Sequence, residues 1–216
     1  MRWMFRGMLG LGCVLLGLGQ ATAASLLVTN PSFESPALVN PGDFTTVSPP
    51  GWTLTGAGGV FKPSVGTSVN SVPDGTQVGY AGALSTGSLF QDLGVAAVTG
   101  QIYQLSVDVG SRKEGFPAHY FVELTEGGVT LNSAAGTISP GTGNFSVVTF
   151  SAVGIAGGGD IGVRLSETGA GQSLFDAVAV STVVASVPEP TSLTMLGIGV
   201  VGMAGYGWRR RQGAAA

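Results

Sequence analysis

The stretch that decides the fold is Ile102–Val109, which reads IYQLSVDV. From Tyr103 onward its odd-numbered residues are apolar, and its even-numbered residues are polar. A period of two puts each class of residue on one face of an extended chain, so this stretch predicts a half-buried β-strand. We expect Tyr103 to lie in the core with the other apolar members, because buried aromatic rings dominate the cores of β-sandwiches.

Further short strands surround this one, separated by clusters of Gly, Pro, Asn and Ser. The expected strands are 77–81, 88–93, 118–126, 145–152, 161–166 and 174–180. No stretch between 24 and 187 has a convincing helical period. Eight to ten short strands in a single domain predict an all-β fold, a β-sandwich of jelly-roll type.

The composition limits the chemistry available to this domain. The chain has 216 residues, of which 37 are Gly, and it holds one Cys and one His. This excludes a Cys/His zinc cluster, a disulfide framework and an ordinary Ser-His or Cys-His nucleophile. Residues 24–187 carry four basic side chains against eleven acidic ones, a balance of −7. Such a surface repels phosphate, so we expect no binding to nucleic acid.

The N-terminus has the three parts of a secretory signal. Arg2 and Arg6 are positive, Met8–Gly19 is apolar, and 21–23 reads ATA, a cleavage site with small residues. The sequence therefore predicts a signal peptide over 1–23, with a retained anchor as the alternative. Its removal would also remove Cys13, the only cysteine.

A second apolar run, about 192–208, precedes the positive cluster Arg209, Arg210 and Arg211. Tyr206 and Trp208 stand at its end, where interfacial aromatic residues belong. We expect a transmembrane helix here, with the arginines in the cytoplasm and 24–187 outside it. A buried core helix is the alternative.

Directly before this run stand Pro188, Glu189 and Pro190. The triplet, the apolar run and the arginine cluster together resemble the PEP-CTERM sorting signal of Gram-negative bacteria, here 187–211. The resemblance implies export, a transient stage in the inner membrane, processing by an exosortase-type enzyme, and a final place at the cell surface or in the extracellular matrix. A plain anchor behind a stiff proline linker is the alternative.

The domain between the two ends, 24–186, carries a further resemblance. Its segments are LVTNPSFE at 27–34, PGW at 50–52, VPDG at 72–75, GQIYQLSVD at 100–108 and SLFDAV at 173–178. Together they resemble galactose-binding-like jelly rolls, which include carbohydrate-binding modules, and a related family of unknown function. The resemblance implies a sandwich with a structural calcium ion and, in some members, a glycan site.

In that family, acids in the opening and closing segments often bind the calcium ion, and Glu34 and Asp176 occupy those positions. Calcium prefers several hard oxygen ligands, and backbone carbonyl groups can supply the rest. Ala177 stands where the family often has a second acid or Asn. The alternative is that Glu34 and Asp176 are solvated or bind backbone N–H groups.

A glycan site needs an aromatic platform beside polar side chains, because sugar rings offer apolar faces and hydroxyl edges. The candidate is the loop 112–117 with the strand after it, and its residues are Arg112, Phe116, His119 and Phe121. The alternative is a solvated loop, with Phe121 packed against the second sheet. We expect Trp52 to belong to the core.

No pattern in the sequence predicts catalysis. Gly157–Gly162 has the G-x-G-x-x-G spacing, but a strand pattern follows it where a dinucleotide fold needs a helix, so we interpret it as a hairpin turn. We therefore expect a non-catalytic surface or matrix protein that associates with exopolysaccharide. The alternatives are a structural, adhesin-like domain with a protein partner, and a glycoside hydrolase with paired carboxylates.

Overall fold

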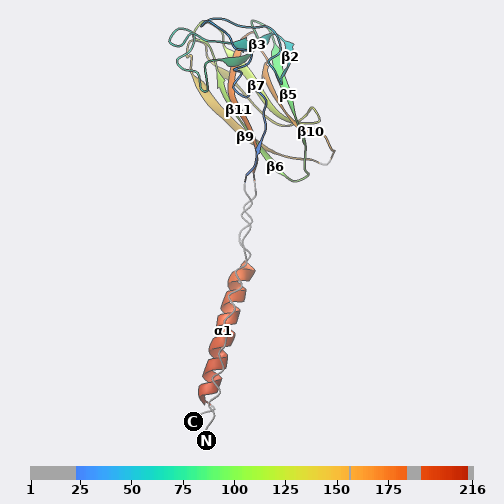
Figure 1. Cartoon of the computed structure of the whole chain (residues 1–216), viewed down its shortest axis with the longest axis vertical. Helices are drawn as coiled ribbons and strands as arrows, with labels where there is room; N and C mark the ends of the chain where they lie inside the picture. Colours follow the sequence, from blue (N-terminus) through green and yellow to red (C-terminus); the bar gives the residue numbers. More distant parts are fainter. Residues whose placement is uncertain (1–22, 156, 184–190, 214–216) are drawn as a thin grey trace.

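The computed structural model describes residues 23–155, 157–183 and 191–213, and its elements are shown in Figure 1. Eleven strands are followed by one helix, α1 (Thr191–Gly213). The strands are β1 (Ser25–Leu26), β2 (Thr53–Gly56), β3 (Gly58–Phe61), β4 (Val78–Ala81), β5 (Gly87–Ala96), β6 (Ile102–Gly110), β7 (Ala118–Glu126), β8 (Val129–Ile138), β9 (Phe145–Val153), β10 (Asp160–Glu167) and β11 (Ser173–Val183).

The strands form two antiparallel sheets. The six-stranded sheet has the order β3-β4-β11-β6-β9. The sixth strand, β1, lies off this path and pairs with Val180 and Ser181 of β11. The five-stranded sheet has the order β2-β5-β10-β7-β8. Neighbours in each sheet are rarely neighbours in sequence, so most connections cross from one sheet to the other. This is the jelly-roll-type β-sandwich that the sequence predicted.

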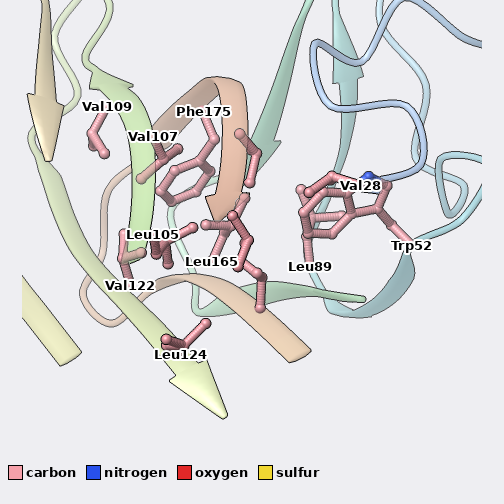
Figure 2. Close-up of a cluster of buried hydrophobic side chains, with 14 of the residues drawn as sticks. Val28, Trp52, Leu89, Leu105, Val107, Val109, Val122, Leu124, Leu165 and Phe175 are labelled. Atoms are coloured by element: carbon pink, nitrogen blue, oxygen red, sulfur yellow. The ribbon is translucent and has the colours of Figure 1, made fainter. Parts of the chain in front are cut away.

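The core lies between the two sheets and follows the alternation seen in the sequence. Leu105, Val107 and Val109 of β6 are completely buried, as are Val122 of β7 and Leu165 of β10. Figure 2 shows these side chains meeting between the strands. Successive residues of a strand point to opposite faces, so the polar partners of each apolar residue face outward.

The predicted strands and core residues are confirmed, with small differences at the strand ends. Trp52 and Tyr103 are both buried, as expected. The sequence analysis missed β1, β2, β3 and β8, which are short or rich in small polar residues. Gly157–Gly162 does lead into a strand, but our hairpin interpretation is wrong. It joins β9 to β10, which belong to different sheets.

A smaller apolar cluster covers the outer face of the six-stranded sheet. It contains Phe61, Val69, Val78, Tyr80 and Leu174. Leu174 belongs to this outer cluster, whereas its neighbour Phe175 points into the main core. Among the residues that the structure describes, both clusters are built from members between Leu26 and Val180, so the sandwich carries a core of its own.

The two predicted targeting segments are described only in part. The signal peptide at 1–23 lies outside the described residues except for Ala23, and so do Pro188, Glu189 and Pro190. The predicted C-terminal helix is confirmed, and Arg209, Arg210 and Arg211 fall within it. Among the helical residues that the structure describes, no segment is both long and apolar enough to cross a lipid bilayer.

Candidate functional site

A cavity of about 210 Å³ opens at one end of the outer apolar cluster. Its walls are four aromatic rings, two aliphatic side chains and two polar side chains: Phe44, Phe61, Tyr80, Phe116, Ala83, Leu84, Arg112 and Gln172. We call it the aromatic pocket. A mostly apolar cavity with a few polar groups at fixed positions is typical of sites for small ligands.

One wall of the aromatic pocket is built on strands β3 and β4. These strands pair so that Gly59 lies opposite Tyr80, and Phe61 ends β3. Phe44 joins this wall through a β-bridge to Phe61. The Tyr80 hydroxyl donates a hydrogen bond of 2.9 Å to the carbonyl of Thr45, which fixes the ring against the segment that carries Phe44.

The other wall comes from the loop between β6 and β7, which carries Arg112 and Phe116. The guanidinium carbon of Arg112 lies 4.8 Å from the centre of the Phe61 ring, a cation–π contact. The Arg112 Nε atom donates to Glu114 at 3.0 Å, so the guanidinium is held from both sides. Arg112 and Phe116, two of the predicted ligand-binding residues, therefore lie together at the pocket.

His119 does not line the pocket, and the contacts it makes are structural. Its Nδ1 atom lies 3.1 Å from Oε1 of Glu167, and its backbone N–H donates to the other oxygen of that carboxylate at 2.9 Å. Glu167 is buried and also accepts hydrogen bonds from Gly169 and Ser173. This network ties β7 to the turn between β10 and β11.

Phe121 is also separate from the aromatic pocket. It lies between Ser166 of β10 and Ala135 of β8 in the five-stranded sheet. Its neighbour Val122 points into the core, so Phe121 faces outward from that sheet. The predicted set of four residues is thus divided, with two at the pocket and two on β7.

Sequence reasoning missed most of the pocket wall. Phe44, Phe61, Tyr80 and Gln172 come from four segments that only the sheet pairing brings together. Tyr80 lies inside a predicted strand, but no pattern in the sequence indicates which strands are its neighbours. Periodicity shows which face a side chain occupies, and it does not show what lies across from it.

A second group of polar residues lies on the outer face of the same sheet. We call Glu34, Asp74, Asp108 and Asp176 the acid cluster. Asp176 is completely buried, and its carboxylate accepts hydrogen bonds from the backbone N–H groups of Asp74 at 2.9 Å and Ala177 at 2.8 Å. Asp108 lies directly opposite Asp176 on β6.

Burial raises the pKa of Asp176 to about 7. Burial is the largest cause of this pKa shift, the two backbone N–H groups act against it, and the negative charges of Asp74 and Asp108 add to it. Burial also raises the pKa of Asp108 above its ordinary value. Burial and the neighbouring carboxylates therefore both disfavour the ionised form of Asp176.

Glu34 reaches the same part of the chain as Asp176. Its Oε1 atom accepts hydrogen bonds of 2.7 Å from the backbone N–H groups of both Thr76 and Gln77. Both predicted calcium ligands thus bind backbone N–H groups, which is the alternative that the sequence left open. Within the ranges that the structure describes, no group of three or more His, Cys, Asp or Glu side chains is arranged to hold a metal ion.

The acid cluster nevertheless fits a calcium ion in its chemistry. Its donors are hard carboxylate oxygens, the type of ligand that calcium prefers. Asp176 and Glu34 would hold such an ion, and its contribution would be to join the opening and closing segments. Calcium at these two residues stays a prediction.

Two family models match the sequence. One, described as HpiC1 cyclase, covers residues 24–181. The other, the PEP-CTERM protein-sorting motif, covers residues 186–211 and confirms the predicted sorting signal. The chain is therefore an exported protein that is sorted by an exosortase-type enzyme to the cell surface or the extracellular space. A search of curated proteins found no significant match.

The domain is similar to several solved structures. A cyclase from Fischerella sp. in its apo form is 23% identical with a TM-score of 0.68, and the match covers 78% of this chain and 100% of that one. The Stig cyclase Fisc from Fischerella sp. TAU, solved with (3Z)-3-(1-methyl-2-pyrrolidinylidene)-3H-indole, is 22% identical with a TM-score of 0.67, covering 76% and 100%. The CBM22-1 xylan-binding domain of Paenibacillus barcinonensis Xyn10C is 20% identical with a TM-score of 0.49, covering 77% and 100%.

Proposed function

This chain belongs to the HpiC1-like cyclase family, and we propose that it is a non-catalytic protein whose aromatic pocket holds a sugar residue of an extracellular polysaccharide. The observation that carries this proposal is the make-up of the pocket wall. Four aromatic rings surround a space for one small ring, and the polar groups beside them are donors and acceptors without acid–base function.

The pocket wall suits a sugar ring in two ways. The apolar C–H face of a sugar stacks on aromatic rings such as Phe116 and Phe61, which supply apolar contact with little loss of side-chain freedom. Arg112 and Gln172 can bind the hydroxyl edge, because a guanidinium donates in a fixed fork and an amide both donates and accepts. The ion pair with Glu114 holds Arg112 in place before a ligand arrives.

The same wall argues against catalysis. A general acid or base must lie within hydrogen-bond reach of the reacting group. The described residues that line the pocket include no Asp, Glu, His, Lys or Cys. The Tyr80 hydroxyl donates to the carbonyl of Thr45, and the Arg112 guanidinium has donors only. These observations support binding without chemical change.

Export supports a polysaccharide as the partner. The sorting motif places the protein outside the cytoplasm, and sorting systems of the type it resembles accompany exopolysaccharide production. In this proposal the precursor lodges in the inner membrane before processing, and the processed protein then meets the polymer at the surface or in the matrix. A purely structural, adhesin-like role with a protein partner is the alternative.

A second candidate function is cyclisation of a small aromatic substrate. Membership of the family favours it, and so does the apolar wall of the pocket, which suits a flat aromatic ring as well as a sugar. It requires an acid–base group to reach the pocket. The two candidates differ in outcome, because cyclisation turns a ligand into an isomer and binding returns the ligand unchanged.

Affinity electrophoresis of the sandwich, residues 24–183, in gels that contain bacterial exopolysaccharides tests the proposal. The expected result is a retarded band for the original protein and for Phe121→Ala, and no retardation for Phe116→Ala. Phe121 is the matched control, since it is the same residue type on the outer face of the other sheet. Equal mobility of all three proteins with every polysaccharide, together with conversion of an indole-bearing ketone to a new isomer, would favour the cyclase.

A further inference from the structure

The polar groups of the aromatic pocket are few, and most of them already have partners. Of the described residues that line the pocket, Arg112, Gln172 and Tyr80 have polar side-chain atoms. The Tyr80 hydroxyl donates to the carbonyl of Thr45 at 2.9 Å. Nη1 of Arg112 donates to Oε1 of Gln172 at 3.5 Å, so these two side chains form a single polar corner in a wall that is otherwise apolar.

The charge of Arg112 is balanced before a ligand arrives. Its Nε and Nη2 atoms both donate to Oε2 of Glu114, and Ser68 donates to the other oxygen of that carboxylate. Residues 24–187 carry four basic side chains against eleven acidic ones. An acidic sugar would bring a second carboxylate to this one guanidinium in a domain that is already negative. The pocket therefore favours a neutral ring.

A wall with one polar corner suits a sugar with few hydroxyl groups. The cavity of about 210 Å³ is smaller than the roughly 300 Å³ at which sites for drug-sized ligands begin, so it has room for one ring. A hydroxyl that enters an apolar site without a hydrogen-bond partner loses its bond to water and gains none. A 6-deoxyhexose, which has a methyl group in place of the hydroxymethyl group, avoids one such loss.

Leu84 is the residue of the pocket wall whose presence the fold does not explain. It lies in the loop between β4 and β5 with a φ of 65°, in the left-handed region where a leucine side chain is strained. Because 64% of its surface is exposed, burial does not offset this strain. Its N–H donates to the carbonyl of Gly171 at 3.3 Å, which holds the leucine beside the residue that precedes Gln172.

The other described non-glycine residues with a positive φ have a local reason for it. Asn30 makes two hydrogen bonds to the backbone of Ser35 through its side chain. Phe33 is completely buried, and Ala177 has only a methyl group as its side chain. Leu84 combines a strained backbone with a large, exposed apolar side chain. Its place in the pocket wall gives that side chain a ligand to contact.

We propose that the aromatic pocket selects a 6-deoxyhexose and that Leu84 contacts its methyl group. This inference rests on the proposed function, because it names the class of sugar that the same pocket would hold. The contact between Leu84 and a methyl group removes apolar surface from water, whereas a hydroxymethyl group at that place would lose a hydrogen bond. A hydrophobic site distinguishes two such groups by about tenfold to a hundredfold.

Competition in affinity electrophoresis tests this selectivity. The gel contains the exopolysaccharide that retards the exported protein, and methyl glycosides are added as competitors in matched sets of three. Each set shares the gluco, galacto or manno configuration, in the D or the L form, and its members carry a hydroxymethyl, a methyl or a carboxylate group at the same carbon. In at least one set, the 6-deoxy sugar should relieve retardation at a concentration at least about tenfold lower than the parent hexose, and the acidic sugar should be the weakest.

Substitutions at Leu84 separate ligand contact from folding. Leu84→Ala and Leu84→Gly should each reduce the preference for methyl over hydroxymethyl to about twofold or less, since the apolar contact is gone. Leu27→Ala, the matched control, shortens a leucine that is 81% exposed and outside the pocket wall, so it should keep the preference. Glycine adopts a positive φ without strain, so Leu84→Gly should melt no lower than Leu84→Ala.

The outcomes distinguish this inference from the proposed function. No retardation in any exopolysaccharide gel overturns the proposed function and this inference with it. Retardation that the parent hexose relieves equally well, that the acidic sugar relieves best, or that no sugar relieves at about 0.1 M overturns this inference alone. A preference for methyl that both Leu84 variants keep, or that Leu27→Ala loses equally, overturns the role of Leu84.

Discussion

The aromatic pocket and the acid cluster share one sheet face but are opposite in chemistry. Tyr80 of the pocket pairs with Leu174 on β11, and Asp176 of the cluster follows two residues later on the same strand. In the pocket, the one charged side chain, Arg112, is held by Glu114 and stacked on Phe61. In the cluster, Asp176 is buried beside two further carboxylates.

The difference indicates which kind of ligand each of the two sites can bind. The charge in the pocket is already balanced, so the space there is available to a neutral ligand. In the cluster, burial and neighbouring carboxylates disfavour the ionised form of Asp176, so this site is suited to a proton or a cation. The predictions below separate the two sites, beginning with the largest expected effect.

The largest effect concerns Asp176 and pH. Its pKa is about 7 in the folded protein against 3.8 for an ordinary aspartate. Between these two values the folded state holds a proton that the unfolded chain has released, so the contribution of Asp176 to stability is greatest below pH 4 and is lost as the pH rises to 7. Each pH unit of this interval is worth about 1.4 kcal/mol, so the total loss is up to about 4 kcal/mol.

Urea unfolding of the sandwich at pH 4, 5, 6 and 7 measures this loss, and Asp176→Asn is the control. The amide does not titrate, so its stability should vary much less over the same range. An equal pH dependence of the free energy of unfolding in the original protein and in Asp176→Asn would contradict the assigned environment of Asp176.

Calcium has the second largest expected effect. An ion bound at the acid cluster at a hundredfold excess over its dissociation constant adds about 2.7 kcal/mol. A chelator should then lower the melting temperature by about 5 to 10 °C for a domain of this size. Glu34→Ala should melt at the same temperature with and without chelator, whereas Asp92→Ala, an exposed acid outside the cluster, should respond as the original protein does.

For each protein, the quantity compared is the difference between its melting temperatures with and without chelator. Glu34 also holds the backbone of Thr76 and Gln77, so its loss lowers stability on its own account. If the original protein melts identically with calcium and with chelator, the cluster binds no calcium. Its carboxylates would then serve only to hold backbone N–H groups.

A smaller effect is expected when a wall of the pocket is removed. Phe116→Ala should weaken ligand binding at least about tenfold, or about 1.4 kcal/mol. Phe116 is only half-buried, so the melting temperature should change little. Titration calorimetry with the ligand found by affinity electrophoresis gives the affinity, and Phe121→Ala should bind as the original protein does. An equal loss in both variants would place the site elsewhere.

The smallest effect concerns the ion pair between Arg112 and Glu114. The Glu114 side chain is 43% exposed, so Glu114→Gln should cost less than about 1 kcal/mol of stability. It should still weaken ligand binding by a few fold, because Arg112 loses the contact that holds it in place. A large loss of stability in thermal unfolding would show that this pair supports the fold rather than the site.

Local patterns in the sequence predicted the sheets well. The alternation in Ile102–Val109 and Ala118–Glu126 gave both the strands and the faces that are buried. Strand β8 was not predicted, because its small residues show no marked alternation of polar and apolar side chains. Its pairing with β7 makes this segment a strand. Pairing between distant segments is a tertiary effect that periodicity does not contain.

The candidate site was predictable only in part for the same reason. Arg112 and Phe116 stood out in the sequence as a basic residue and an aromatic residue in one loop. This loop crosses from β6 to β7 and so from one sheet to the other, which places Phe116 beside Tyr80 and leaves Phe121 on the outer face of the five-stranded sheet. Sequence proximity therefore grouped residues that the sandwich separates.

The central claim is that the aromatic pocket binds a sugar and leaves it unchanged. The most direct test is a calorimetric titration of the sandwich with oligosaccharides from the exopolysaccharide of the producing cell, followed by chromatography of the recovered ligand. The account predicts saturable binding that Phe116→Ala removes, and a ligand that elutes unchanged. A new product, or no binding by the folded original protein to any fraction of the polymer, would contradict it.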